Sequence, residues 1–210
     1  MIPRMPAPHR RRPAALLRMA LASPCAVLLA ACTASSTLPS PPTVAADEAR
    51  DLSRTERLAQ DLVDADAAFA AGDTASLAPL VERIAVLEPE WLEKDTPSPL
   101  REWRVLVPDT APPMRGRALG PGYMRGQVPG GARRVTEQLL LSGEIAHIAL
   151  GSAPRGGLAL RVRDADGKLA CEHDPAHARD CRFVPIFTQR YRIEIENTGE
   201  AVARYYLVVD

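Results

Sequence analysis

The chain has 210 residues, of which 46% are hydrophobic and 25% are charged, with a formal net charge of zero. This composition excludes a fully disordered chain and a protein with many membrane spans, and the neutral balance predicts no nucleic-acid partner. The charges are unevenly distributed. Residues 1–31 carry five arginines and no acid, residues 47–95 carry 13 acids and 5 bases, and residues 96–210 carry 16 bases and 13 acids. We therefore expect three segments with different physical roles.

Residues 1–31 have the layout of an export signal. A basic region, residues 4–18, precedes the mostly apolar stretch 19–31, which ends in small residues. At a rise of about 1.5 Å per residue, this apolar stretch is short for a membrane span. A basic region followed by a short apolar region and a small-residue end is typical of a signal peptide that is removed. The run Arg10-Arg11-Arg12 leaves twin-arginine export as an alternative route.

The last residues of this segment, Leu29-Ala30-Ala31-Cys32, resemble the lipobox of bacterial lipoproteins. The resemblance implies cleavage before Cys32 and attachment of diacylglycerol and an acyl chain, such as palmitate, to that residue. Two or more acyl chains hold a protein stably on a membrane. Thr33 in the following position favours the outer membrane, facing the periplasm, by the same resemblance. An ordinary cleaved signal with a chance cysteine is the alternative.

Residues 32–45 then predict a flexible linker behind the lipidated cysteine, because residues 33–45 contain no charge and three prolines. Residues 46–95 predict an acidic helical hairpin packed on the domain that follows. The first helix covers 46–71 and is stopped by Gly72, and the second begins with Asp73 or Thr74 as its N-cap and ends before Pro89. A single tetratricopeptide-like unit is the alternative for this hairpin, although the chain has no second copy.

Residues 96–132 predict a proline-rich crossing, because residues 97–129 contain seven prolines. Proline removes a backbone donor and fixes φ, which disfavours helices and central strands over most of this stretch. Within it, Trp103–Val107 predicts a short strand. The glycines between Gly116 and Gly122 lack the spacing of a phosphate-binding loop.

Residues 133–210 predict a small all-β sandwich, because apolar and polar residues alternate in short runs separated by turn residues. Asp166-Gly167 and Asn197-Thr198-Gly199-Glu200 are the clearest turns. The predicted fold class is α+β: an N-terminal helical hairpin followed by a jelly-roll-like sandwich that folds without residues 33–95. The predicted strands are 133–141, 144–150, 158–163, 169–173, 182–187, 191–195 and 201–209.

Four stretches of this region, LSGEIAHIAL, LALRVRDADGK, RYRIEIENTG and ARYYLVV, resemble the bacterial pre-peptidase C-terminal domain. That family is a small β-sandwich, often appended to secreted proteins and generally non-catalytic. The resemblance covers about residues 133–209. Gly157-Leu158 stands where the family usually has an aspartate-leucine pair. The resemblance implies a fold and names no substrate.

Cys171 and Cys181 predict a disulfide, because an even pair of cysteines in an exported chain is normally oxidised. The alternative is a periplasmic metal-binding module. Cys171, His173, His177 and Cys181 form a C-x-H-x3-H-x3-C pattern with four zinc-type ligands. Oxidation argues against this site, because a disulfide supplies no thiolates.

No catalytic signature occurs in the sequence, and we predict a non-catalytic binding, adaptor or structural role without a cofactor. The expected partners are the membrane, through the lipid on Cys32, and an envelope protein or glycan. Asp164-Ala165-Asp166-Gly167 predicts a plain turn, because the further ligands of a calcium loop are absent. His147 predicts a half-buried structural histidine. The remaining alternative is a hydrolase with an unrecognised site assembled across the proline-rich crossing, which a pocket that gathers His147 with a carboxylate and a nucleophile would favour.

Overall fold

The computed structural model describes residues 51–107 and 120–210, in which helices come first and a β-rich region with two sheets follows. The predicted signal, Cys32, the linker and residues 108–119 of the predicted crossing lie outside the described residues. No helix within the described ranges is long and apolar enough to cross a membrane.

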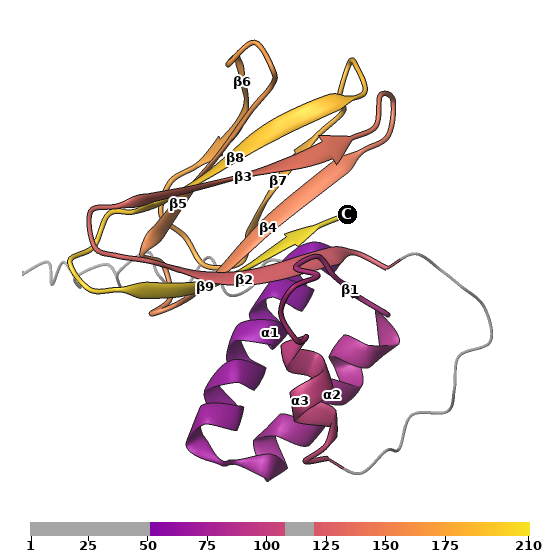
Figure 1. The fold of residues 1–210 in the computed structure, drawn as a ribbon, viewed down its shortest axis with the longest axis vertical. Helices are drawn as coiled ribbons and strands as arrows, with labels where there is room; N and C mark the ends of the chain where they lie inside the picture. Colours follow the sequence, from indigo (N-terminus) through magenta and orange to yellow (C-terminus); the bar gives the residue numbers. More distant parts are fainter. Residues whose placement is uncertain (1–50, 108–119) are drawn as a thin grey trace, which may run out of the picture. The chain divides into compact units, whose positions relative to one another are not determined.

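Three helices form the first part (Figure 1). Ser53 caps α1 through a capping box with Glu56, and Asp73 caps α2 by accepting from the backbone N–H of Ser76. Gly72 ends α1 in the left-handed conformation, with φ 69°, as the sequence indicated. The helices are α1 (Arg54–Ala71), α2 (Thr74–Val86) and α3 (Pro99–Arg104).

The third helix corrects one prediction, because Trp103 lies in α3 and the expected strand 103–107 does not form. Pro99 stands in the first turn of α3, where its missing N–H costs nothing. Trp103 is fully buried. The predicted hairpin of α1 and α2 is therefore only part of a three-helix layer.

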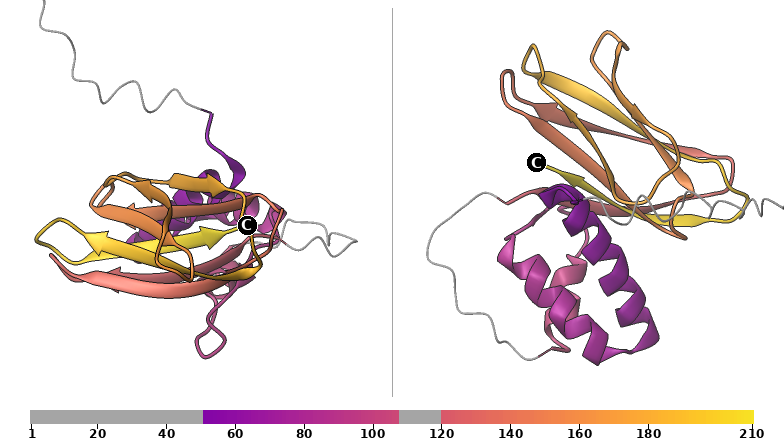
Figure 2. Two further views of the ribbon diagram at one scale, coloured as in Figure 1. Left: turned by 90° about the horizontal axis from the view of Figure 1, so that it is seen from above. Right: turned by 180° about the vertical axis from the view of Figure 1, so that it is seen from behind.

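Two facing sheets form the second part (Figures 1 and 2). One sheet has the order β1-β2-β9-β4-β7 and the other β3-β8-β5-β6. From β2 to β9 the chain distributes eight strands over the two sheets, as a jelly roll does. The strands are β1 (Glu90–Trp91), β2 (Gly122–Val128), β3 (Arg133–Leu140), β4 (Ala146–Ala153), β5 (Leu158–Arg163), β6 (Leu169–His173), β7 (Arg179–Phe183), β8 (Gln189–Asn197) and β9 (Ala203–Val209).

The largest differences from the sequence prediction concern β2 and β7, while β1 was not expected and β4 runs to Ala153 rather than ending at residue 150. β2 occupies residues expected to belong to the crossing and pairs along its whole length with β9, because the prolines that flank it lie outside the paired residues. β7 lies at Arg179–Phe183 rather than at 182–187, since its pairing partner in β4 ends at Ala146 and Pro185 follows. Residues 184–188 therefore form a loop.

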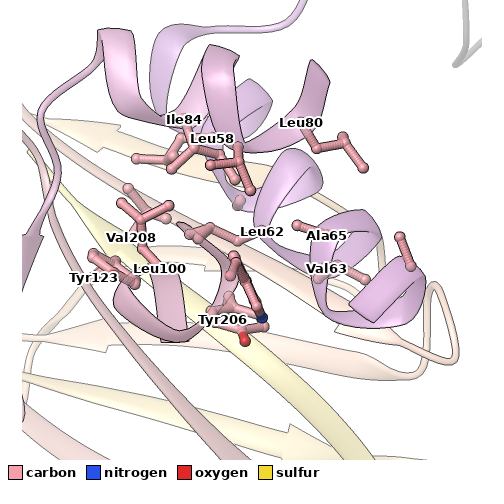
Figure 3. Close-up of a cluster of buried hydrophobic side chains, with 14 of the residues drawn as sticks. Leu58, Leu62, Val63, Ala65, Leu80, Ile84, Leu100, Tyr123, Tyr206 and Val208 are labelled. Carbon is pink, nitrogen blue, oxygen red and sulfur yellow. The ribbon is translucent and has the colours of Figure 1, made fainter. Parts of the chain in front are cut away.

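The five-stranded sheet separates two hydrophobic cores. The first lies between the two sheets and includes Ile148, Leu160, Ile193 and Leu207, all at most 2% exposed. The second lies between the helices and the outer face of the five-stranded sheet (Figure 3). Its buried members include Leu58, Leu62, Ile84, Leu100, Tyr123, Tyr206 and Val208.

The core between the helices and the five-stranded sheet requires small residues on β4. Ala149 faces the helices, and a Cβ on Gly151 would meet the carbonyl oxygen of Ala59 in α1 at 2.5 Å. The two elements thus approach so closely that only glycine fits without movement. The helices cover apolar strand residues that would otherwise meet water. Whether the sandwich folds without residues 33–95, as the sequence predicts, therefore depends on how it tolerates exposure of this face.

Candidate functional site

The disulfide-closed loop between β6 and β7 contains most of the site residues that the sequence indicated. Cys171 and Cys181 form a disulfide with their Cα atoms 5.7 Å apart. Cys181 is fully buried at the edge of the sandwich core, so the bridge joins the two sheets. The predicted pair of cysteines is therefore disulfide-bonded in the structure.

The fold brings together only three of the four residues of the C-x-H-x3-H-x3-C pattern. One ring nitrogen of His173 and the two sulfurs of Cys171 and Cys181 lie within 4.8 Å of one another, and His177 is not part of this group. Nε2 of His173 lies 2.6 Å from the carbonyl oxygen of Asp180, which bridges β6 and β7. Because the sulfurs are bonded to each other, this state offers no thiolate ligand.

His177 has a structural contact of its own. Its Nδ1 accepts a hydrogen bond from the backbone N–H of Ser152 at 3.2 Å, which requires an unprotonated Nδ1. Burial lowers the pKa of His177, and the nearby charge of Arg155 lowers it further. Its Nε2 is buried without a hydrogen-bond partner among the described residues. The neutral imidazole thus fixes the loop to β4.

His147 belongs to a network that the sequence did not reveal. Its Nδ1 lies 2.8 Å from Oδ2 of Asp180, and the two side chains are 27% and 14% exposed. The hydroxyl of Thr55 lies 3.5 Å from the same carboxylate oxygen. The backbone N–H of Asp180 donates to Oε1 of Glu56 in the first turn of α1 at 3.2 Å. The network therefore fastens the start of α1 to the edge strand β7.

This arrangement contains a histidine–carboxylate pair but does not complete a nucleophilic site. A nucleophile must reach the imidazole, and the Thr55 hydroxyl contacts the carboxylate instead. Among the residues that the structure describes, the His147 ring contacts Asp180. The position is consistent with the structural histidine that the sequence predicted.

The turn Asp164–Gly167 is closed by the carboxylate of its first residue. Oδ1 of Asp164 accepts from the backbone N–H groups of Asp166 and Lys168 at 3.1 and 2.8 Å. Gly167 has φ 80°, as the tight turn requires. The carboxylate thus closes the hairpin between β5 and β6, as expected for a plain turn.

The open surface of the molecule is the outer face of the four-stranded sheet, which no described helix covers (Figure 2). Arginines and glutamates alternate across its strands. Arg161 contacts Glu172 and Glu196, while Arg133 and Arg163 lie 3.5 and 3.7 Å from Glu194. We name this surface the open face. It is defined by Arg133, Val135, Glu137, Arg161, Arg163, Glu172, Arg192, Glu194 and Glu196.

A cleft of about 370 Å³ lies at one end of the open face. Its walls combine three arginines with three carboxylates, so it offers both charges to a ligand. The lining side chains come from β3, β5, β8 and the β5–β6 turn: Glu137, Arg163, Asp164, Ala165, Asp166, Gly167, Arg190 and Arg192. The open face and this cleft are the candidate functional site.

Sequence reasoning did not identify this site, because the residues of the face are spread over four strands. The register brings Glu137 opposite Arg192 and Arg161 opposite Glu194, pairs separated by dozens of residues in the chain. The available signal was the alternation of charged residues along β5 and β8. That alternation shows which residues face outward but not which strands are neighbours.

No protein-family model matches the chain, and no curated protein matches it. Solved structures similar to it include the pre-peptidase C-terminal domain of a Bacillus anthracis collagenase, with 14% identity and a TM-score of 0.36 over 42% of this chain and 87% of that one. The Yersinia pseudotuberculosis-derived mitogen has 13% identity and a TM-score of 0.37, covering 43% and 84% of the two chains.

A periplasmic inhibitor of g-type lysozyme from Aeromonas hydrophila has 11% identity and a TM-score of 0.35, with the match covering 43% of this chain and 84% of that one. Similarity at this level gives no ligand and no activity. A pre-peptidase C-terminal domain, the family that residues 133–209 resemble, is therefore among the solved structures to which this chain is similar in part.

Proposed function

We propose that this chain is a lipid-anchored protein of the bacterial cell envelope whose sandwich is a non-catalytic binding or adaptor module. The observation that carries the proposal is Leu29-Ala30-Ala31-Cys32 at the end of a short apolar segment. A diacylglyceryl group with an N-acyl chain on Cys32 would hold the chain firmly on a membrane. Thr33 supports the outer membrane, with the described domain in the periplasm.

The disulfide supports an exported location, because protein thiols stay reduced in the cytosol and are oxidised in the periplasm. Residues 33–45 would serve as a linker between the lipid and the folded domain, since they lack charge and contain three prolines.

The contacts of the buried polar side chains support a structural rather than catalytic use of the interior. Asp61 pairs with Arg83 at 2.7 Å, and Asn197 donates to the carbonyl oxygens of Val128 and Ala201. Such contacts satisfy buried groups and hold turns and helices in place. The open face then remains as the surface that a protein or glycan partner in the envelope can reach.

Fatty-acid labelling in cells tests the anchor. Wild-type protein should incorporate labelled palmitate and require detergent for extraction, since its lipid lies in the bilayer. Cys32→Ala should incorporate none. Cys25→Ala is the matched control, because Cys25 precedes the cleavage point and is removed with the signal. Equal labelling of Cys32→Ala and the control would disprove the anchor.

Site-specific photo-cross-linking in intact envelopes tests the open face. Val135, on the edge strand β3 of the open face, is 47% exposed, and Val86 on α2 is 59% exposed and serves as the control position. A photoreactive amino acid at position 135 should give a discrete partner adduct that position 86 does not give. Identical adduct patterns at both positions, or none at 135, would contradict partner binding by this face.

A further inference from the structure

At one end of the sandwich two loops lie side by side, the β3–β4 hairpin and the β7–β8 loop, and the β5–β6 hairpin reaches the same end (Figure 1). The hydroxyl of Ser142 donates to the carbonyl oxygen of Ile186 at 2.6 Å, and the N–H of Gly143 donates to that of Pro185 at 3.0 Å. The N–H of Ser142 also donates to the hydroxyl of Thr188 at 3.0 Å. The two loops therefore form one projecting unit.

The side chains of this unit are apolar and exposed. Ile186 is 74% exposed and Phe187 is 68% exposed. We call the group the apolar tip: Leu139, Leu141, Ile145, Val184, Ile186 and Phe187. Exposed apolar residues scattered singly are ordinary, whereas several gathered at one end of a molecule mark an interaction site.

We propose that the apolar tip inserts into the lipid–water interface of a bilayer, an inference that rests on the proposed membrane location of the chain. Insertion of a loop requires that its backbone polar groups find partners within the protein, because the apolar region of a bilayer offers none. Here the hydrogen bonds between the loops supply partners for the donors of Ser142 and Gly143 and for the carbonyls of Pro185 and Ile186.

One arginine beside the tip is placed to meet a lipid surface. Arg182 and Arg190 flank the β7–β8 loop, and Arg190 lines the cleft that also contains Glu137, Asp164 and Asp166. Glu144 stands in the β3–β4 turn as the acidic residue of the unit. Arginine can extend its apolar stem along buried surface and place its guanidinium at the level of lipid phosphates. Arg182 would thus bind a headgroup while the tip lies deeper.

The proposed anchor lies within reach of this end of the domain. The described chain begins next to α1, and Glu56 in the first turn of α1 accepts from the N–H of Asp180 on β7. β7 leads from Asp180 to Val184, a distance of about 13 Å at the usual strand rise. Residues 33–50 span at most ~60 Å. A lipid on Cys32 and the apolar tip can therefore enter the same bilayer.

A second copy of the chain is a poorer occupant for the tip. A stable protein interface buries about 800 Å² on each partner over a closely matched surface. Insertion into lipid has no such requirement for a matching shape.

Fluorescence quenching in proteoliposomes tests the proposal on the full chain. Phe187→Trp places a reporter in the tip, and Val202→Trp places one in the β8–β9 turn at the opposite end, where Val202 is 54% exposed. Each variant is reconstituted into vesicles of phosphatidylethanolamine and phosphatidylglycerol with brominated acyl chains. Wild type, which contains Trp91 and Trp103, gives the background.

The tip reporter should lose most of its added emission to the bromines and shift to shorter wavelength, while the control reporter stays unquenched. Adding Ile186→Asp to Phe187→Trp should abolish the quenching, because a carboxylate resists entry into the bilayer. Equal quenching of both reporters, or a blue shift at 187 that depends on protein concentration and not on vesicles, would overturn the proposal in favour of no insertion or of self-association.

The outcome is separable from that of the anchor test. Should the chain purify without lipid on Cys32, the same vesicles are added to the soluble protein, and quenching at position 187 still measures insertion. A lipidated chain with an unquenched tip would contradict the inference alone. An unlipidated chain with a quenched tip would contradict the anchor alone.

Discussion

The backbone N–H of Asp180 on β7 donates to a carboxylate oxygen of Glu56 in the first turn of α1 at 3.2 Å. The other oxygen of the same carboxylate accepts from the N–H of Ser53 at 2.8 Å and so completes the capping box of α1. Glu56 is only 1% exposed. A single buried side chain thus defines where the helix begins and where it contacts the edge of the sheet.

Replacing Glu56 by Ala should lower the free energy of unfolding by about 2–3 kcal/mol, because the helix loses its capping box and the N–H of Asp180 loses a buried acceptor. Glu56→Gln should cost less, since the amide oxygen can still accept one of these bonds. Urea unfolding of both variants measures the difference. If Glu56→Ala unfolds at the same urea concentration as the wild type, the hydrogen bonds of Glu56 do not stabilise the fold.

Gly151→Ala should destabilise the protein by about 1–3 kcal/mol, as insertion of a methyl group into a packed contact usually does. The new Cβ would meet the carbonyl oxygen of Ala59, and this backbone atom cannot rotate away. Gly157→Ala is the matched control, because nothing lies within 4 Å of its Cβ position. Equal thermal midpoints for the two variants would contradict the close packing of α1 on β4.

The stability of the domain should fall as the pH is lowered through 6.5, the ordinary pKa of histidine, because the pKa of His177 is lowered in the folded state. Below the unfolded pKa the unfolded chain binds a proton that the folded chain does not, so stability declines with falling pH until the folded pKa is passed. Urea unfolding at a series of pH values between about pH 5 and pH 8 measures this decline in the free energy of unfolding.

His177→Asn provides the comparison, because its side-chain oxygen can replace Nδ1 as the acceptor for the N–H of Ser152 while carrying no titrating group. The variant should show a smaller loss of stability at low pH than the wild type. Parallel pH profiles for the two proteins would assign the effect to other groups.

Replacing Cys171 and Cys181 together by Ser should cost about 2–3 kcal/mol, the chain-entropy value for a closed loop of roughly ten residues. Intact mass with and without reduction establishes the disulfide in protein from the periplasm, and urea unfolding gives the cost. Two free thiols in such material would contradict the bridge.

The helical part should be required for a well-packed sandwich. A chain lacking residues 51–107 would expose Tyr123, Tyr206 and Val208, which are at most 3% exposed beneath the helices. We expect such a fragment to bind a hydrophobic dye and to lose its cooperative thermal transition. A cooperative melt without dye binding would restore the prediction, made from alternation alone, that the sandwich folds by itself.

Several elements could be predicted from local sequence. β5 and β6 occupy the predicted residues 158–163 and 169–173, because the turn Asp166-Gly167 fixes their register and alternation identifies their buried faces. The start of α2 at Asp73 also follows from a local capping pattern. Each of these signals lies within a few residues of the element it defines.

The errors arose where distant residues decide the structure. Trp103 is β-favouring by type but lies in α3, where it packs against Tyr206 of β9 with ring centroids 6.3 Å apart. The sequence also did not reveal the ring contacts of His173 and His177, which join β6 to β7 through Asp180 and the β6–β7 loop to β4 through Ser152. Such contacts depend on strand order, which local patterns do not contain.

The central claim, a lipid anchor on Cys32, is tested most directly by the mass of the N-terminal peptide of the protein extracted from bacterial membranes. The account predicts that this peptide begins at Cys32 and carries the added mass of a diacylglyceryl group, with or without a further acyl chain. A mature N-terminus at another residue, or an unmodified Cys32, would contradict it.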